Sequence, residues 1–172
     1  MDFLQQAPLT ANYNAEVLAA GTTTTLSSTN AFSYSIDGFL YAKAALSNTA
    51  TPTTDKNTGV AFVGIAAGFC SIFAVLLNAA GTLAVVQGQV QAIDVANSPI
   101  NLPQLPAIPA GYVPVGLIGV SVKPTGATWT FGSSNLSGAA NTVYSFIDVG
   151  TYPSRPPQFN LLGVGGFVDN LS

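Results

Sequence analysis

The chain has 172 residues, of which only 6% are charged, against about 25% in an ordinary soluble domain. Four basic residues and a net charge of −3 exclude the basic surface that nucleic-acid binding requires, so we expect no nucleic-acid partner. With no histidine and a single cysteine, the chain lacks the commonest general base and metal ligand and cannot form an internal disulfide.

The first 19 residues are predicted to form an N-terminal arm. Phe3 and Leu4 give this arm an apolar start, and mainly polar residues follow. Asp2 stands where a secretion signal would carry basic residues, so we expect a protein that is made and kept in a cytoplasm until it is used. A threonine-rich strand is expected directly after the arm, at residues 22–26.

Residues 32–43 carry the clearest local signal, which predicts an antiparallel hairpin. Asp37 and Gly38 supply the positive φ angles of a two-residue type I′ turn between two alternating strands. In this register the large side chains fall on one face of the ribbon: Phe32, Tyr34, Ile36, Phe39 and Tyr41. Asp37 is interpreted as a turn former and not as a calcium ligand, because no D-x-D-x-D-G loop surrounds it.

Residues 59–77 form an uncharged run of nineteen residues, and about 20 apolar residues are enough to cross a bilayer as a helix. Three glycines interrupt the run, and its first part is rich in valine, phenylalanine and isoleucine, which disfavours a continuous helix. We therefore expect two buried strands, at 60–66 and 69–77, bent at Gly68. A membrane-spanning helix stays open as the alternative, because length and hydropathy permit it.

A second hairpin is expected, because Asn78 and Gly81 are turn formers between two β-rich runs. Three glutamines recur with period two, which places them on one face of the return strand: Gln87, Gln89 and Gln91. Further strands are expected at 112–122, 127–132 and 142–149. With about eight or nine short strands, residues 20–157 are predicted to form an all-β domain, either an antiparallel β-sandwich or a jelly-roll-like barrel.

Three segments are predicted to lie outside the strands. Residues 47–58 are expected to form an exposed loop in which Asp55 is solvated. Residues 97–114 hold five of the eleven prolines and are expected to cross from one sheet to the other, because proline cannot donate a ladder hydrogen bond. Residues 158–172 form a C-terminal arm that is expected to lie on a neighbouring molecule. Its large apolar residues are Phe159, Leu161, Leu162, Val164 and Phe167.

The sequence offers little chemistry for catalysis. Without histidine a nucleophilic serine or cysteine lacks its usual partner, and the seven acidic residues are isolated in sequence. Cys70 has apolar neighbours and is interpreted as a buried, unreactive thiol. Trp129, Tyr112 and Tyr144 would suit a sugar-binding platform, although aromatic residues on alternating strands are more often core residues. We expect no enzyme, no bound metal and no cofactor.

Five stretches of the chain carry a resemblance to a known group of proteins. In order they are AGTTTTLSSTNAFSYSIDGFLYAKAA, NAAGTLAVVQGQV, LPAIPAGYVPVGLIGV, TFGSSNLSGAANTVYSFIDV and PSRPP. Over residues 20–157 this order resembles small β-rich virion proteins of tailed bacteriophages that are encoded among head genes. The resemblance implies a structural role, as a decoration or cement protein on the exterior of the capsid.

The low charge agrees with this implication, since neutral hydroxyls and amides contact another protein without removing water from ions. The main hypothesis is a homotrimeric cement protein of the virion, made in the host cytoplasm, that bridges major capsid proteins and binds neither nucleic acid nor membrane. A trimer matches the three-fold symmetry of shell junctions. The candidate subunit and capsid contacts are apolar residues of both arms: Phe3, Leu4, Phe159, Leu161, Leu162 and Phe167.

Two alternatives stay open. The first is a host-receptor or glycan-binding module of a phage fibre or spike, which would use exposed aromatic side chains. The second is a small membrane protein such as a lysis factor, which requires residues 59–77 to be helical.

Overall fold

The structure, a computed structural model, describes residues 9–94, 99–100 and 104–149. These residues form eleven strands and no helix. In chain order the strands are β1 (Ala11–Asn12), β2 (Leu18–Ala20), β3 (Thr25–Ser28), β4 (Phe32–Ile36), β5 (Phe39–Lys43), β6 (Thr49–Ala50), β7 (Phe69–Asn78), β8 (Leu83–Gln87), β9 (Gln91–Ala92), β10 (Tyr112–Val122) and β11 (Thr142–Asp148). All strand pairings among them are antiparallel.

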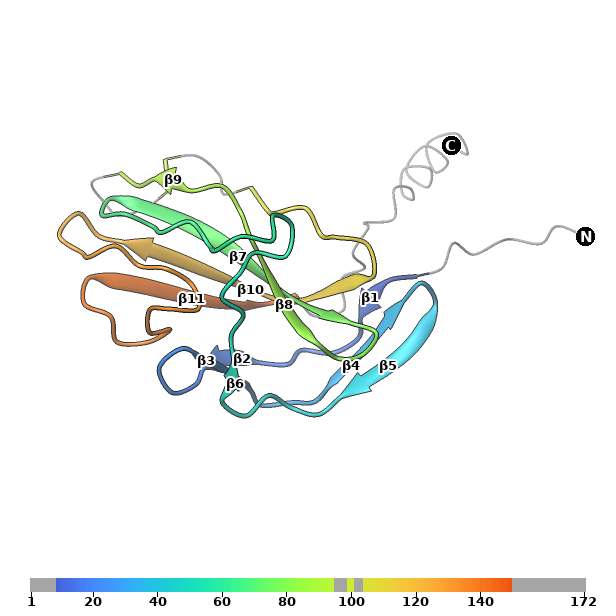
Figure 1. The fold of residues 1–172 in the computed structure, drawn as a ribbon. Coiled ribbons are helices and arrows are strands. Elements are labelled where there is room, and N and C mark those ends of the chain that lie inside the picture. Colours follow the sequence, from blue (N-terminus) through green and yellow to red (C-terminus); the bar gives the residue numbers. More distant parts are fainter. Residues whose placement is uncertain (1–8, 95–98, 101–103, 150–172) are drawn as a thin grey trace, which may run out of the picture.

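The strands build a two-layered antiparallel β-sandwich (Figure 1). One layer is a five-stranded sheet in the order β11-β10-β7-β8, with β9 also paired to β7. The other layer consists of two three-stranded sheets, β1-β4-β5 and β2-β3-β6. This arrangement confirms the predicted fold class. In the described part of the chain no helix is long and apolar enough to cross a membrane, and residues 59–77 contain no helix, so the membrane-helix alternative is wrong.

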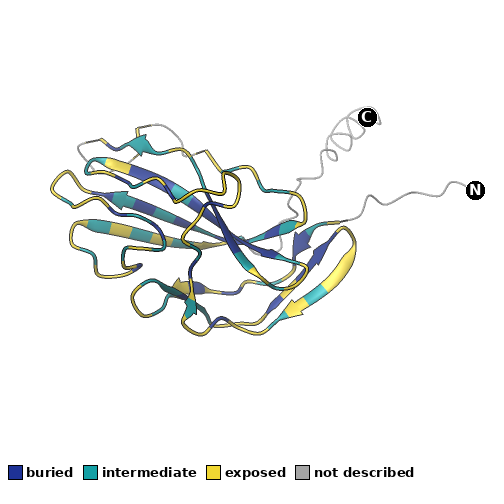
Figure 2. Cartoon of the chain, in the orientation of Figure 1, coloured by how far each residue is buried: buried dark blue, intermediate teal, exposed yellow. Residues whose placement is uncertain are grey.

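The hydrophobic core lies between the two layers, because the strands turn their larger apolar side chains inward. Figure 2 shows that most of β7 and β4 is buried, whereas β5 is largely exposed. Each of the three sheets contributes buried residues, among them Leu26, Phe32, Tyr34, Val75, Leu77, Val113, Val115 and Ile118. Aromatic rings extend the core beneath the loop that follows β10. The ring of Phe73 lies 4.8 Å from that of Phe131 and 5.8 Å from that of Trp129, measured between centroids.

The first predicted hairpin is confirmed. β4 and β5 pair in the predicted register, with Tyr34 opposite Tyr41 and their rings stacked at 5.7 Å. The turn residues Asp37 and Gly38 have φ angles of 51° and 85°, as a type I′ turn requires. Phe39 is nevertheless 70% exposed, whereas Ile36, directly opposite it on β4, is buried, because β5 is the edge strand of its sheet and β4 is the central strand.

The second predicted hairpin, formed by β7 and β8, is also confirmed. Asn78 organises its turn, because its Oδ1 accepts hydrogen bonds from the backbone N–H groups of Ala80 at 3.0 Å and Thr82 at 2.8 Å. Gly81 adopts a φ of 71° in the same turn. The bend predicted at Gly68 is present directly before β7, where this glycine has a φ of 82°.

The strand predicted at residues 60–66 is wrong. This segment makes only isolated bridges, one from Ala61 to Thr54 and one from Ile65 to Trp129. Phe62 and Ile65 are both buried although they lie three positions apart. In a strand, the residues that face the same side of the sheet are two positions apart. Phe62 and Ile65 cover part of the core, whereas Val60 and Val63 are 62% and 64% exposed.

Two further predictions fail where the backbone leaves the sheet. Residues 127–132 form no strand and contribute a single bridging residue. The three glutamines do not share one strand, because β8 ends at Gln87 and β9 begins at Gln91. Gly88 lies between them, and a Cβ at this position would stand 2.8 Å from the carbonyl oxygen of Gln104. The close approach of another segment therefore interrupts the predicted strand.

The described part of the predicted N-terminal arm is built into the domain. β1 pairs with β4, β2 pairs with β3, and Leu18 is buried in the core. The strand predicted at 22–26 is displaced to β3, because Thr23 has a φ of 55° and turns the chain before it. The remainder of this arm, residues 1–8, and the predicted C-terminal arm, residues 158–172, lie outside the described residues.

The proline-rich segment does not cross between sheets, because β9 and β10, which it joins, both pair with β7. Its described residues include 99–100 and 104–111; Ile108 packs against buried residues of β7 and β8 on the outer face of the five-stranded sheet, and Pro99 lines a groove with residues of β7, β10 and β11. The side-chain amide of Asn57 also donates to the carbonyl of Ala107 at 2.8 Å. The segment therefore covers one part of the sheet's outer face.

Asp55, predicted to be solvated, is only 6% exposed and binds the free edge of β8. Its Oδ2 accepts a hydrogen bond from the N–H of Gln87 at 2.6 Å. Its Oδ1 accepts hydrogen bonds from the N–H groups of Asn57 at 2.7 Å and Thr58 at 3.0 Å. The predicted exposed loop at residues 47–58 is therefore partly buried, because this carboxylate turns inward to satisfy backbone donors.

We expect Asp55→Asn to lower the free energy of unfolding by about 2 kcal/mol. Asparagine keeps one acceptor, but its NH₂ group would face the N–H of Gln87, which then loses its partner. Urea unfolding followed by circular dichroism measures the change. Asp37→Asn is the matched control, because asparagine suits the same turn and its stability should stay near that of the parent. Equal stabilities for the two variants would contradict the assigned role of Asp55.

Candidate functional site

The six residues predicted to contact other subunits or the capsid lie outside the described residues. They are Phe3, Leu4, Phe159, Leu161, Leu162 and Phe167. The described residues present two apolar surfaces that these predictions did not include. One lies on the outer face of the five-stranded sheet, and the other lies at the turn between β4 and β5.

The outer face of the five-stranded sheet is covered in one part and open in another. In the covered part, Leu76 and Val86 are buried, and Ile108 and Tyr112 pack against them. In the other part, β7, β10 and β11, together with Pro99 of the proline-rich segment, form a groove with a volume of about 180 Å³. We call it the β10–β11 groove. Its lining residues include Cys70, Ile72, Gly119, Ser121, Val143 and Ser145.

The β10–β11 groove is a depression because small residues lie on this face of the two strands. Gly119 lies opposite Ser145, and Ser121 lies opposite Val143. None of the residues that line the groove is charged. Cys70, at one side, is buried as predicted, and burial raises the pKa of its thiol. The groove is therefore a neutral surface suited to apolar contact.

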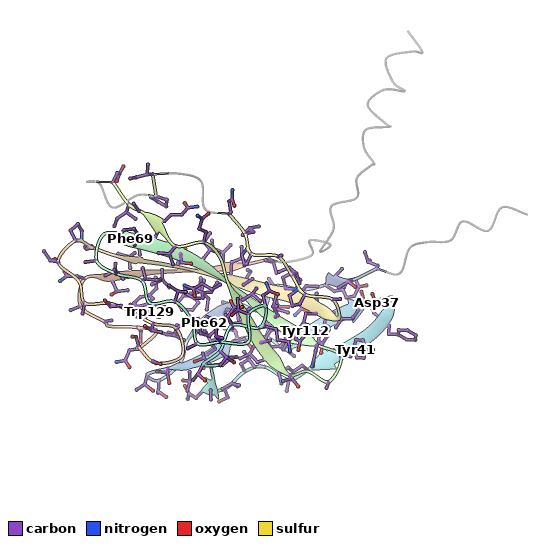
Figure 3. The ribbon with its side chains drawn as sticks, turned by 45° about the horizontal axis from the view of Figure 1, so that its top comes forward. Asp37, Tyr41, Phe62, Phe69, Tyr112 and Trp129 are labelled. Carbon is purple, nitrogen blue, oxygen red and sulfur yellow. The ribbon has the colours of Figure 1, made fainter. Side chains whose placement is uncertain are left out.

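The second apolar surface consists of Leu9, Phe39 and Leu40, and we call it the hairpin tip. Phe39 is 70% exposed and Leu40 is 76% exposed. The backbone of Leu9, whose side chain is 47% exposed, lies at the same turn, because the N–H of Gly38 donates to its carbonyl at 3.0 Å. β5 is largely exposed in Figure 2, and Asp37 and Tyr41 mark the position of the hairpin in Figure 3. Phe39 and Leu40 are consecutive residues of β5 and face opposite sides of the ribbon, so the hairpin tip exposes a large apolar side chain on each of its faces.

A polar pair is buried next to β1. Glu16 is fully buried, and its Oε2 accepts a hydrogen bond from the side-chain amide of Asn12 at 3.0 Å. Its other carboxylate oxygen, Oε1, accepts no hydrogen bond from the described residues. Burial raises the pKa of Glu16 to about 7, and the nearby charge of Asp148 contributes to the rise. This carboxyl group therefore titrates near neutral pH.

Of the three aromatic residues predicted as either core or sugar platform, Trp129 belongs to the core, and Tyr144 and Tyr112 are partly buried at its borders. Trp129 is 1% exposed, and its indole N–H donates to the carbonyl of Asn135 at 2.8 Å (Figure 3). The hydroxyl of Tyr144 donates to the same carbonyl at 2.9 Å, and its ring packs against Trp129. Tyr112 is partly exposed, with the Nζ of Lys56 5.3 Å from its ring centroid.

The two apolar surfaces differ in how far the sequence could have revealed them. The β10–β11 groove has a signal, because Gly119, Ser121 and Ser145 leave one face of two predicted strands without large residues. The hairpin tip has none, because which large residues of the ribbon are covered depends on the opposite layer. The burial of Glu16 also depends on segments distant in sequence.

The described residues offer binding surfaces more clearly than catalytic chemistry. They contain no group of three His, Cys, Asp or Glu side chains placed to hold a metal ion. The β10–β11 groove and the hairpin tip are both suited to bury apolar side chains from another molecule. Comparisons of the chain with protein-family models, curated proteins and solved structures found no match.

Proposed function

We propose that this protein is a non-enzymatic structural protein of a virion, namely a homotrimeric cement protein on the outside of a phage capsid. It bridges neighbouring major capsid proteins and thereby stabilises the shell. The observation that supports this function best is the presence of two separate apolar surfaces, the hairpin tip and the β10–β11 groove, on a β-sandwich of low charge. The resemblance to phage virion proteins supplies the choice of partner.

Low charge favours a bridging role for a physical reason. Lysine and glutamate side chains must lose bound water before they enter an interface, and this costs free energy unless each charge is paired. Hydroxyls, amides and apolar groups avoid most of this cost. An interface of about 800 Å² per partner, repeated over several neighbours, then stabilises a shell without any single strong contact.

Uptake onto purified capsids tests the proposal directly. Capsids that lack the protein are mixed with it, sedimented and assayed for bound protein and for resistance to heat. We expect saturable binding together with a higher disruption temperature of the particles. A protein that sediments as a monomer at micromolar concentration and does not bind capsids would contradict the proposal.

Removing the hairpin tip should weaken capsid binding without unfolding the protein. In the double variant Phe39→Ser and Leu40→Ser we expect capsid affinity to fall by about tenfold or more, because exposed apolar anchors dominate interfaces. Its thermal midpoint should change little, since both side chains are mostly exposed. The matched control is Val60→Ser with Val63→Ser, which removes two valines that are 62% and 64% exposed. Equal losses in both variants would argue against a specific contact at the hairpin tip.

A second candidate function, glycan recognition by a phage fibre or spike, is favoured by one observation. A depression lined by hydroxyl and amide side chains lies over the loop between β10 and β11, next to Trp129. Its polar lining residues include Thr125, Thr128, Ser133, Ser134, Asn135 and Asn141. Binding to host polysaccharide, lost in Asn135→Ala and absent with capsids, would favour this function over the first.

A further inference from the structure

A buried pair of one acid and one amide lies in the segment that leads from β1 to β2. Glu16 is 0% exposed, and Asn12, the second residue of β1, is 1% exposed. The side-chain amide of Asn12 donates to Oε2 of Glu16 at 3.0 Å and to the carbonyl of Asn14 at 2.9 Å. Both donors of this amide are therefore used within the segment itself.

The pair leaves one oxygen of each partner without a donor. Oδ1 of Asn12 and Oε1 of Glu16 are buried, and neither accepts a hydrogen bond from the described residues. A buried oxygen without a donor is costly, because it has lost the hydrogen bonds that water would give it. A single proton satisfies both atoms, since a protonated carboxyl has an O–H group that can donate to the amide oxygen. The pair thus has the hydrogen-bonding pattern of a neutral acid.

The groups around Glu16 also favour its neutral form. Burial raises the pKa of Glu16 to about 7, and the carboxylate of Asp148 in β11 adds to the rise. Asp148 is bound to the same region, because its Oδ1 accepts a hydrogen bond from the N–H of Leu18 at 3.3 Å. The other partners are neutral: the N–H groups of Thr29 and Asn30 each donate to the backbone carbonyl of Glu16 at 3.1 Å. Loss of the proton would place a buried negative charge near a second one.

The segment that carries the pair, residues 9–16, is held mainly by polar contacts. Its buried side chains are those of Ala11, Asn12 and Glu16, of which only Ala11 is apolar. β1 is two residues long and is the edge strand of its sheet, next to β4 (Figure 1). Segments with few buried apolar contacts open locally at a lower cost than the core does. Residues 9–16 can therefore leave β4 without unfolding the sandwich.

The residue that follows the pair suits a hinge. Val17 has a φ of 54°, in the left-handed region that a β-branched residue rarely adopts. Directly beyond it the chain is fixed again, because Leu18 is buried in the core and β2 pairs with β3. Movement about Val17 relieves backbone strain and leaves β2 in place. We propose that residues 9–16 form a latch on β4, which is closed while the Glu16 carboxyl holds a proton and opens when that proton is lost.

Opening of the latch changes which strand lies at the edge of the sheet. In the closed state β1 pairs with β4, and the N–H of Tyr13 donates to the carbonyl of Ser33 at 2.9 Å. In the open state β4 has no neighbour on this side, and its backbone groups become available to another strand. The latch thus makes access to one sheet edge depend on pH. It goes beyond the proposed function, because it is a property of the isolated chain.

Hydrogen exchange of the folded chain, followed by NMR, tests the latch. The reporting amides are those of Tyr13, Thr29 and Asn30, whose hydrogen bonds the opening breaks. Protection factors are compared, because they correct for the effect of pH on exchange itself. Between about pH 5 and about pH 8 we expect those of the reporting amides to fall by roughly 50- to 100-fold, since the closed state holds the proton that the open state loses.

Urea separates local opening from global unfolding. Low concentrations of urea should leave the exchange of the reporting amides unchanged, because opening of the latch exposes little surface. The amides of β7 and β10, which lie in the core sheet, exchange by global unfolding and should exchange faster as urea is added.

Glu16→Gln is the decisive variant. Glutamine offers a C=O group to the amide of Asn12 and an N–H group to its Oδ1, so it imitates the protonated acid. Its reporting amides should keep the same protection at both pH values. The matched control is Asp37→Asn, the same change from acid to amide at an exposed turn residue, and it should behave as the parent does.

Three results would overturn the inference. The first is protection that does not change with pH in the parent, which would mean that something other than a proton completes the pair. The second is an equal fall in Glu16→Gln, which would assign the effect to another group. The third is a set of reporting amides with the same protection and urea dependence as those of β7 and β10. The first and third need only the parent chain, so the inference stays testable even where the variant does not fold.

Discussion

Replacing Trp129 with alanine is expected to lower the free energy of unfolding by about 3–5 kcal/mol. Trp129 is 1% exposed, and its ring contacts those of Phe73, Phe131 and Tyr144 at centroid distances of 5.8, 5.9 and 6.0 Å. Alanine removes this packing and leaves a cavity that the surrounding β-sheet cannot close. The carbonyl of Asn135 also loses one of its two donors. Urea unfolding followed by circular dichroism measures the loss.

Trp129→Phe separates packing from hydrogen bonding. Phenylalanine keeps an aromatic ring in the core but cannot donate to Asn135, which still accepts a hydrogen bond from Tyr144. We expect this variant to lose about 1–2 kcal/mol, mostly from the smaller ring and the missing bond. A loss below about 1 kcal/mol in the alanine variant would show that the loop after β10 does not pack on the core as described.

The second large effect is a change in the free energy of unfolding with pH, which arises from Glu16. Its pKa is raised to about 7 in the folded protein, whereas the value for an unperturbed carboxyl is 4.5. Below pH 4.5 both states hold the proton, and the stability that this group contributes is fully present. Between pH 4.5 and 7 the unfolded chain ionises while the folded protein keeps the proton, so the free energy of unfolding falls. Above pH 7 both states are ionised and the fall ends.

Glu16→Gln isolates this contribution from that of the other carboxylates, including Asp148. Glutamine has a similar shape but does not ionise. The free energy of unfolding of the variant should therefore show no fall with rising pH that is due to residue 16. We expect the stability of the variant relative to the parent to rise by roughly 2–3 kcal/mol between about pH 4 and about pH 8. Unfolding in urea at several pH values measures it. A difference that stays constant with pH would mean that the pKa of Glu16 is the same in the folded and unfolded states.

The parts of the fold that were predicted correctly depend on residues close in sequence. Asp37 and Gly38 select a turn type by themselves, and Asn78 binds two N–H groups within four residues of its own position. Long alternating runs such as that of β10 also identify a strand without reference to its partner. These signals were enough to predict an all-β antiparallel sandwich.

The parts that were missed depend on residues far apart in sequence. Residues 60–66 have the composition of a strand, but no neighbouring strand is available to pair with them beyond single bridges. Asp55 is buried because the N–H of Gln87, more than thirty residues later, needs an acceptor. The two apolar surfaces follow the same rule, since the exposure of Phe39 and the openness at Gly119 depend on what the rest of the fold covers.

The five-stranded sheet is blocked on one side and free on the other. Along β8 and β9, the N–H of Lys56 donates to the carbonyl of Val85 at 2.9 Å, and the N–H of Ile100 donates to that of Ala92 at 3.1 Å. β11 carries no corresponding strand on its outer side among the described residues. Addition of a strand from another molecule is thus possible at a single position. Among the described residues, edge-to-edge pairing through the five-stranded sheet is therefore confined to β11, and such pairing joins two of these sheets and not a row of them.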